Sequence, residues 1–153
     1  MIDPGPLVDD FLAVAELAHM PITRGQLTVE SLPAPHRPPS RLPAGRMAVY
    51  VFAYGDTTLK VGKAGSNSQA RYISQHYNAG SAPSTLATSL IKRGAEIGIP
   101  DLSNESVSEW IKTHTDRINF VLESEAGIDS LSLLEAFLHC RLKPVFEGFA
   151  SQR

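Results

Sequence analysis

The pattern of apolar and polar residues predicts a β-hairpin near the middle of the chain. The segment 46–65, "RMAVYVFAYGDTTLKVGKAG", holds an apolar run rich in aromatic and β-branched residues. The turn "YGD" follows it, and then a second short run that we expect to close at Gly62. Later in the chain, "RINFVLE" at 117–123 alternates as a strand does. These segments predict a small sheet with mostly antiparallel strands.

Apolar residues at helical spacing predict helices before and after the hairpin. The first helix is expected at residues 6–20, with Pro6 in its first turn and its end before Pro21. Further helices are expected at 69–77 after the N-cap Ser68, at 85–93 between Ser84 and Gly94, at 104–115, and at 130–143 before Pro144. This order of elements favours an α+β domain.

A proline-rich segment separates the first helix from the hairpin. Residues 32–45, "LPAPHRPPSRLPAG", contain five prolines and show no apolar period. We interpret this stretch as an extended, basic linker. The expected division of the chain is therefore an N-terminal helix with a proline-rich basic linker at residues 1–46, followed by the main domain at residues 47–153.

Composition narrows the class of protein. At 153 residues and 42% hydrophobic content, the chain can bury the core of one domain. The N-terminus is acidic where a secretory signal would be basic, and no run approaches the roughly 18 apolar residues of a membrane span. We therefore expect a cytoplasmic protein without a membrane partner. The single cysteine, Cys140, cannot form a disulfide within the chain and is expected in the core.

The net charge of −2 hides an uneven distribution of charge along the chain. Residues 21–95 contain nine Lys/Arg and two acids, whereas residues 96–135 contain two Lys/Arg and nine acids. The first segment could meet anions such as phosphates. Folding could equally interleave the two segments and cancel their charges.

Glu135 conflicts with its sequence neighbours. On a helix, Leu131, Leu138 and Leu142 would lie on the same face as Glu135, which places a carboxylate where the helix should pack into the core. One interpretation is a capping box, in which Ser132 is the N-cap and Glu135 bonds back to it. The other is that Glu135 faces a cleft and holds a hard divalent cation such as Mg²⁺.

The hairpin and the helix after it hold further candidate residues. Tyr50 and Lys60 are expected to project from neighbouring strands on one face of the sheet. Arg71 lies near the start of the next helix, where backbone N–H groups favour an anion. The intervening loop "GKAGSNSQ" has neither the pattern of a P-loop nor that of a dinucleotide-binding fold. Packing is the usual role of a strand tyrosine, and solvent exposure that of a strand lysine.

In combination, these segments resemble the GIY-YIG nuclease superfamily. The resemblance rests on "AVYVF", on "LKVGKAG" some ten residues later, on Arg71 in the following helix, and on Glu135 in the late helix "LLEAFLHCRLKPVFEG". Val49 and Tyr50 stand in the first motif of the family, and Lys60, Val61 and Gly62 stand in the second. The similarity extends over residues 47–148.

The resemblance implies a small three-stranded antiparallel sheet flanked by helices, and hydrolysis of DNA phosphodiester bonds with one divalent metal, Mg²⁺ or Mn²⁺. By this analogy Tyr50 orients or deprotonates the attacking water, Arg71 holds the scissile phosphate, and Glu135 binds the metal. Lys60 replaces the tyrosine that is usual in the second motif, and it could assist the water or stabilise phosphate charge.

Two positions depart from the family pattern. One helical turn after Arg71 the family often has His or Tyr, but this chain has Gln75 there, with His76 next to it. On an ideal helix His76 would lie roughly 140° around from Arg71, so either the helix is distorted or His76 serves elsewhere. The asparagine that the family carries near the end of the domain has no clear counterpart, and Glu147 occupies that neighbourhood.

The sequence therefore predicts a metal-dependent DNA endonuclease or nickase with the site residues Tyr50, Lys60, Arg71, His76 and Glu135. The basic residues Arg37, Arg41 and Arg46 would contact DNA phosphates. Cutting both strands with one such site would favour a homodimer or sequential nicking. The alternatives are a non-catalytic nucleic-acid-binding module of the same fold, or a protein-interaction domain.

Overall fold

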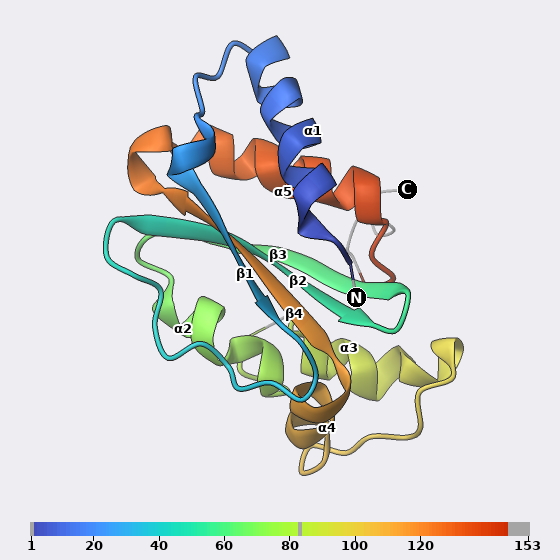
Figure 1. Ribbon diagram of the computed structural model, residues 1–153. Helices are drawn as coiled ribbons and strands as arrows, with labels where there is room; N and C mark the ends of the chain where they lie inside the picture. Colours follow the sequence, from blue (N-terminus) through green and yellow to red (C-terminus); the bar gives the residue numbers. More distant parts are fainter. Residues whose placement is uncertain (1, 83, 147–153) are drawn as a thin grey trace.

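The sheet has four antiparallel strands in the part of the chain that the structure, a computed structural model, describes: residues 2–82 and 84–146. The strands are β1 (Leu27–Leu32), β2 (Arg46–Tyr54), β3 (Thr57–Ala64) and β4 (Asp116–Glu123), and their order in the sheet is β1-β4-β2-β3 (Figure 1). The α+β class is confirmed.

The expected count of three strands is wrong, because β1 adds a fourth. It pairs with β4 from Leu27 opposite Leu122 to Leu32 opposite Arg117. Its sequence "LTVESL" begins with an apolar–polar alternation, but the run is short and much of it is polar, so it gives a weak strand signal on its own. The segment is a strand because it pairs with the buried strand β4, and not because of its own apolar pattern.

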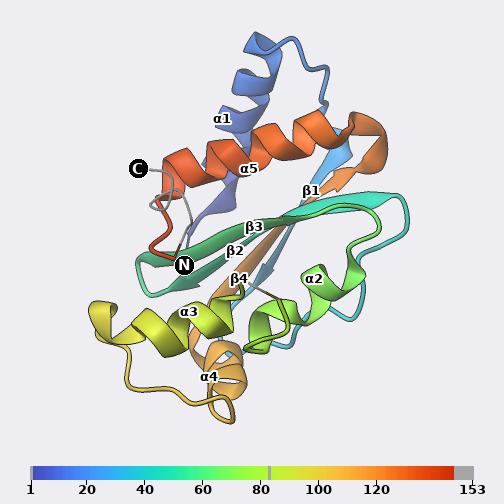
Figure 2. The same ribbon diagram turned by 180° about the vertical axis from the view of Figure 1, so that it is seen from behind.

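Helices cover both faces of the sheet. The five α-helices of the described residues are α1 (Pro4–Leu17), α2 (Gln69–Ile73), α3 (Leu86–Arg93), α4 (Val107–His114) and α5 (Ile128–Leu142). Helices α1 and α5 lie on one face, and α2, α3 and α4 lie on the other, as the views from the front and from behind both show (Figures 1 and 2).

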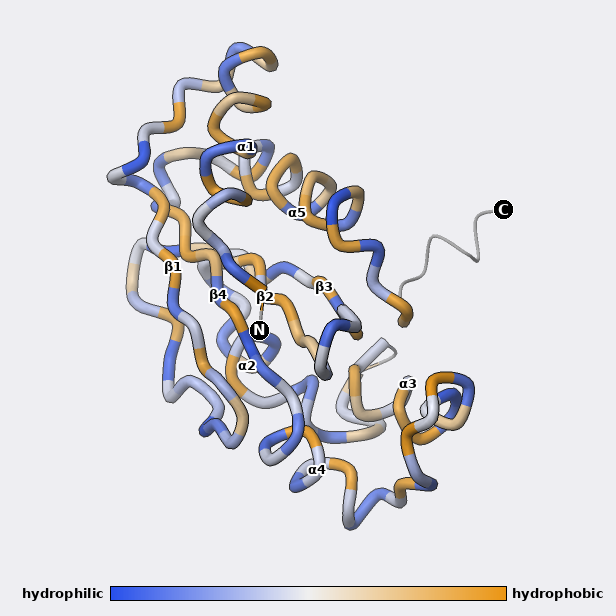
Figure 3. Tube along the Cα trace, turned by 45° about the vertical axis from the view of Figure 1, so that its right-hand side comes forward, coloured by the Kyte–Doolittle hydropathy of each residue, from blue (hydrophilic) through white to orange (hydrophobic). Residues whose placement is uncertain are grey.

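Two hydrophobic cores result, one on each side of the sheet. Successive strand residues point to opposite faces, so Val49 and Val51 pack toward α1 and α5, whereas Tyr50 and Phe52 pack toward α2, α3 and α4. Strand β2 is buried on both sides by this arrangement, and hydrophobic residues accordingly concentrate along the central strands (Figure 3).

Three local expectations need correction. The strand β3 does not close at Gly62 but continues to Ala64, with Gly62 opposite Tyr50. The N-cap of α3 is Thr85 rather than Ser84, since the Thr85 side chain accepts a hydrogen bond from the backbone N–H of Thr88 at 3.1 Å. Cys140 is exposed and not in the core, because it follows the buried Leu138 by two residues, or roughly 200° around α5.

The segment before β2 belongs to the same cores as the rest of the protein. Helix α1 packs against α5, and the side chain of Phe11 is fully buried there. Residues 33–45, here called the arm, are extended as expected, yet they are held in place by hydrogen bonds. The backbone N–H of His36 donates to the carbonyl of Lys112 at 2.8 Å, and the N–H of Ala34 donates to the Asp116 carboxylate at 2.9 Å.

A buried arginine on β4 joins the sheet to α2 and to the turn that follows it. The side chain of Arg117 is only 1% exposed, and its guanidinium carbon lies 4.9 to 5.9 Å from the ring centres of Tyr50, Phe52, Tyr72 and Tyr77. Its nitrogens donate hydrogen bonds to the Asn119 side chain at 2.8 Å, the Tyr77 hydroxyl at 3.2 Å and the Tyr72 carbonyl at 2.6 Å. The aromatic faces and these acceptors together compensate the buried charge.

We expect Arg117→Met to lower the free energy of unfolding by about 3 kcal/mol, since it leaves several buried polar atoms without their donor. Urea denaturation measures the change. The control is Arg24→Met, which removes the same charge from an exposed ion pair with Asp9 and should cost less than about 1 kcal/mol. Equal stability of the two variants would contradict the structural importance of Arg117.

Candidate functional site

Tyr50 lies at the centre of the candidate site, with its phenol ring over Gly62. The side chain is 0% exposed. A Cβ atom built on Gly62 would lie 2.8 Å from both the Cε2 and the hydroxyl oxygen of Tyr50. No side chain fits between the two strands at this point, so the glycine of β3 is required for the tyrosine of β2 to lie flat against the sheet.

The hydroxyl of Tyr50 binds two of the predicted site residues. Its oxygen lies 2.6 Å from His76 Nε2 and 3.1 Å from Arg71 Nε. The helix α2 ends at Ile73, and a separate 3₁₀ turn, Gln75–Tyr77, follows it. This break changes the direction in which residue 76 points, and it brings the buried His76 into the place that an unbroken helix would have given to Gln75.

The hydrogen bonds of His76 identify which of its nitrogens carries the proton. The backbone N–H of Leu86 donates to Nδ1 at 3.2 Å, so Nδ1 is an acceptor and Nε2 carries the hydrogen. Burial, with the positive charges of Lys60, Arg71 and Arg117 adding to it, lowers the pKa of His76 to about 3. At neutral pH the ring is therefore uncharged, and it donates to Tyr50.

Tyr50 consequently accepts two hydrogen bonds, one from His76 and one from Arg71. Burial raises the pKa of Tyr50 to about 12, although the charge of Arg71 opposes this effect. The phenol is thus protonated at neutral pH, and its own hydrogen must point away from both donors. A protonated phenol in this arrangement can orient a reacting group, but it is poorly suited to remove a proton from one.

Arg71 connects this buried cluster to the surface. Its Nε also donates to the backbone carbonyl of Lys63 at 2.9 Å. The terminal Nη atoms make no hydrogen bond to any residue within 2–82 or 84–146. A partly buried guanidinium whose terminal nitrogens are available can bind an oxyanion through two parallel hydrogen bonds.

Glu135 lies at the same end of β3, on α5. Its carboxylate pairs with the ammonium of Lys63 at 2.7 Å, and Lys63 also donates to the Ser132 hydroxyl at 3.3 Å. The Glu135 side chain is 23% exposed, and its charge tends to raise the pKa of Tyr50. The capping interpretation is wrong, because α5 begins at Ile128 with Gly127 as N-cap and Ser132 is already inside the helix.

Lys60 projects from β3 on the same face of the sheet as Tyr50, as expected. Its strand partner is Phe52, and its buried ammonium donates to the Ser84 hydroxyl at 3.3 Å and to the Phe146 carbonyl at 3.4 Å. Its charge contributes to the low pKa of His76. Lys60 therefore affects the cluster electrostatically, from below the surface. Glu147, the other residue noted in the sequence, lies outside the described residues.

A residue that the sequence analysis did not select, Lys63, links the two halves of the site. Its carbonyl accepts from Arg71 on one face of the sheet, and its side chain reaches Glu135 on the other. Strand alternation could have identified it, since Lys63 shares the parity of Val61 and so points toward the helix that carries Glu135.

Within residues 2–82 and 84–146, Glu135 is the predicted site residue that offers a carboxylate for a metal. The described residues contain no group of three or more His, Cys, Asp or Glu side chains that could hold a metal ion. One carboxylate nevertheless fits Mg²⁺, which keeps several waters and takes oxygens from substrate phosphates. The Lys63 ammonium, a cation held at 2.7 Å from Glu135, shows that this position accepts positive charge.

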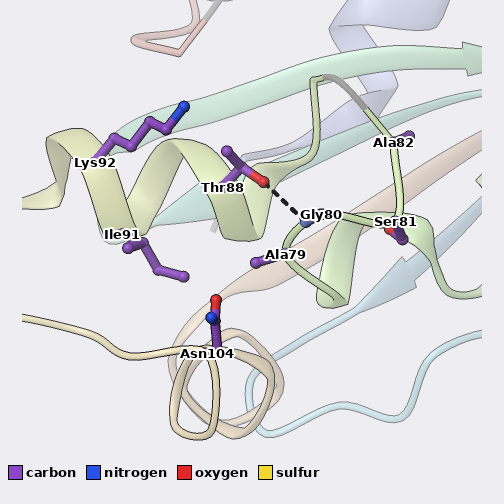
Figure 4. Close-up of a pocket in the computed structure, with 8 residues that line it drawn as sticks. All are labelled: Ala79, Gly80, Ser81, Ala82, Thr88, Ile91, Lys92 and Asn104. Atoms are coloured by element: carbon purple, nitrogen blue, oxygen red, sulfur yellow. Dashed lines mark hydrogen bonds between the residues drawn. The ribbon is translucent and has the colours of Figure 1, made fainter.

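The site does not coincide with the hollow between α3 and the loop after the 3₁₀ turn. That hollow, about 630 Å³ in volume, is lined by residues 79–82, Thr88, Ile91, Lys92 and Asn104 (Figure 4). The backbone N–H of Gly80 donates to the Thr88 hydroxyl across it at 3.3 Å. None of the five predicted site residues lines this hollow.

Comparison with known proteins gave no match: no protein-family model, no curated protein and no solved structure matches the chain. Among the described helices, none has the length and apolar character needed to cross a membrane.

Gly62→Ala should destabilise the fold by about 1–3 kcal/mol, because the added methyl group collides with the Tyr50 ring. Chemical denaturation provides the measurement. Gly65→Ala is the matched control, since the nearest atom to a Cβ there lies 4.0 Å away and the change should be small. An equal effect of both substitutions would show that the close approach of Tyr50 is not what requires glycine.

The pH dependence of stability should report the buried neutral His76. The unfolded chain protonates this histidine near pH 6.5, whereas the folded protein does so only near 3, so the contribution of neutral His76 is complete above 6.5 and is lost as the pH falls toward 3. Between these values the unfolding free energy should drop by at most about 1.4 kcal/mol per pH unit because of His76. The variant His76→Gln should show a shallower slope in urea denaturation. His36, whose pKa burial also lowers, is present in both proteins, so parallel slopes would disprove the assignment to His76.

Proposed function

We propose that the protein is a DNA endonuclease or nickase of the GIY-YIG type, which hydrolyses phosphodiester bonds with Mg²⁺ or Mn²⁺. The observation that carries the proposal is the cluster in which Arg71 and His76 both donate to the Tyr50 hydroxyl, while Glu135 lies at the same end of β3. A phosphodiester needs a carboxylate that can hold a cation and a guanidinium that can bind an oxyanion, and Glu135 and Arg71 supply these groups from the two sides of Lys63.

In this proposal Arg71 binds the scissile phosphate through its terminal nitrogens and stabilises the charge that develops on it. The hydroxyl hydrogen of Tyr50 points away from the two donors, Arg71 and His76, and it orients the attacking water. His76 keeps Tyr50 in position, and it stays neutral because it is buried and has cations around it. A metal ion bound by Glu135 would supply Lewis-acid stabilisation of the phosphate and the leaving oxygen.

The arm lies where it could guide DNA toward Arg71. The side-chain amide of Gln69, at the start of α2, bonds both the N–H and the carbonyl of Leu42, each at 2.8 Å. The arm is thereby attached to the helix that carries Arg71. Arg37 and Arg41 are exposed, whereas Arg46 is partly buried in an ion pair with Glu123 at 2.9 Å. Arg37 and Arg41 are the better candidates for phosphate contacts.

A binding module without catalysis is the second candidate, and the burial of the cluster favours it. The side chains of Tyr50, Lys60 and His76 are all buried, so the Tyr50 hydroxyl has no direct contact with bulk water in this structure. We propose a cytoplasmic location for the nuclease, and a homodimer or successive nicks for cutting both strands.

Nicking of supercoiled plasmid tests the nuclease. Wild-type protein should nick DNA with Mg²⁺ or Mn²⁺ and not with EDTA, and Glu135→Ala and Arg71→Ala should each lower the rate by about 100-fold or more. Tyr50→Phe should also reduce it, because the orienting hydrogen is lost. Glu125→Ala removes an exposed carboxylate elsewhere and should leave the rate unchanged.

DNA binding in the same samples separates the two candidates. The measured quantity is the slope of the logarithm of the binding constant against the logarithm of the salt concentration. If this slope is steep for the wild-type protein, and the double variant Arg37→Ala/Arg41→Ala lowers its magnitude by up to about 2, the arm contacts phosphates. Salt-dependent binding with no cleavage above that of Glu135→Ala would leave the binding module. Absence of binding even at low salt would exclude both nucleic-acid candidates.

A further inference from the structure

Lys63 occupies the position between the phosphate-binding and the metal-binding parts of the proposed site. Its backbone carbonyl is bonded to Arg71 Nε at 2.9 Å, and this contact does not depend on the side chain. Its ammonium lies 2.7 Å from Glu135 Oε2 and 3.3 Å from the Ser132 hydroxyl. The ammonium therefore sits against the carboxylate that a divalent cation would need.

We infer that Lys63 is an internal competitor for the metal: its ammonium neutralises Glu135 in the free protein and must leave before a divalent cation binds there. This inference rests on the proposed function, since it concerns the metal site of that function. It adds a regulatory role for a residue outside the set of Tyr50, Lys60, Arg71, His76 and Glu135.

The competition follows from charge and space. An ammonium in contact with a carboxylate oxygen uses one of the few anionic ligand atoms, and its charge repels a second cation that approaches the same group. Glu135 is not part of a group of three or more His, Cys, Asp or Glu side chains among the described residues, so no larger set of ligands holds a metal there. A single pairing with Lys63 is therefore enough to occupy the site.

The same geometry lets Lys63 be displaced by substrate. Its side chain is 36% exposed and carries a point charge on a flexible stem. A phosphate bound at the Nη atoms of Arg71 would lie near the backbone of Lys63, since the Lys63 carbonyl already accepts from Arg71 Nε. The ammonium could then move from Glu135 to a phosphate oxygen, which frees the carboxylate. Metal and phosphate would raise each other's affinity, since such coupling is reciprocal.

Titration of the 153-residue chain with Mn²⁺, followed by electron paramagnetic resonance without DNA, tests the inference. Lys63→Met should bind Mn²⁺ roughly fivefold more tightly than the wild type, a change in the range of a partly exposed ion pair. Lys63→Gln should behave in the same way. Lys92→Met removes the charge of an exposed lysine on α3 and should leave Mn²⁺ affinity unchanged.

The variant Glu135→Gln separates failure of the inference from failure of the proposed function. If Glu135→Gln weakens Mn²⁺ binding while Lys63→Met binds no more tightly than Lys92→Met, the competition is disproved and the metal site stands. If Glu135→Gln binds Mn²⁺ as the wild type does, the metal is not on Glu135, and both ideas fail. A Lys63→Met protein that is folded by circular dichroism but binds no Mn²⁺ also overturns the competition.

Discussion

The hydroxyl of Tyr50 is the point on which the candidate site depends. It lies inside the protein, against Gly62, and receives hydrogen bonds from Arg71 and His76. A buried polar atom that keeps its partners is stable, and one that loses them is costly, so this oxygen fixes the short helix α2 and the 3₁₀ turn after it relative to the sheet. The position of Arg71 at the surface is a consequence of that buried bond.

Burial and nearby positive charge set the protonation state of His76. Burial is the main cause of the low pKa of His76, and the charges of Lys60, Arg71 and Arg117 lower it further. Arg117 is enclosed by aromatic rings, and the ammonium of Lys60, a residue of β3, is buried. The histidine therefore serves as a neutral donor and not as a cation. Folding also pairs charges of the basic segment 21–95 with charges of the acidic segment 96–135. The ion pairs Arg46–Glu123 and Lys63–Glu135 each join the two segments. Folding thus cancels some of that asymmetry and leaves other cations in the core.

Much of the fold was accessible from sequence patterns, because those patterns are local. The β2–β3 hairpin, the helix stop at Gly94 and the position of β4 follow from apolar alternation and turn residues. Strand β1 was not predicted, since its identity as a strand comes from pairing with β4 and not from its own six residues. The exposure of Cys140 was also missed, because apolar neighbours in sequence do not reveal which side of α5 faces the sheet.

The sequence by itself determined the α+β class, the shared face of Tyr50 and Lys60, and the conflict at Glu135, since each depends only on strand or helix periodicity. Only the tertiary structure decided how the conflict is resolved and which neighbour of Arg71 reaches Tyr50. Glu135 is neutralised by Lys63, which comes from a strand far away in the chain, and His76 reaches Tyr50 because α2 ends early. Contacts between distant segments, and the break in a helix that such contacts stabilise, leave no periodic trace in the sequence.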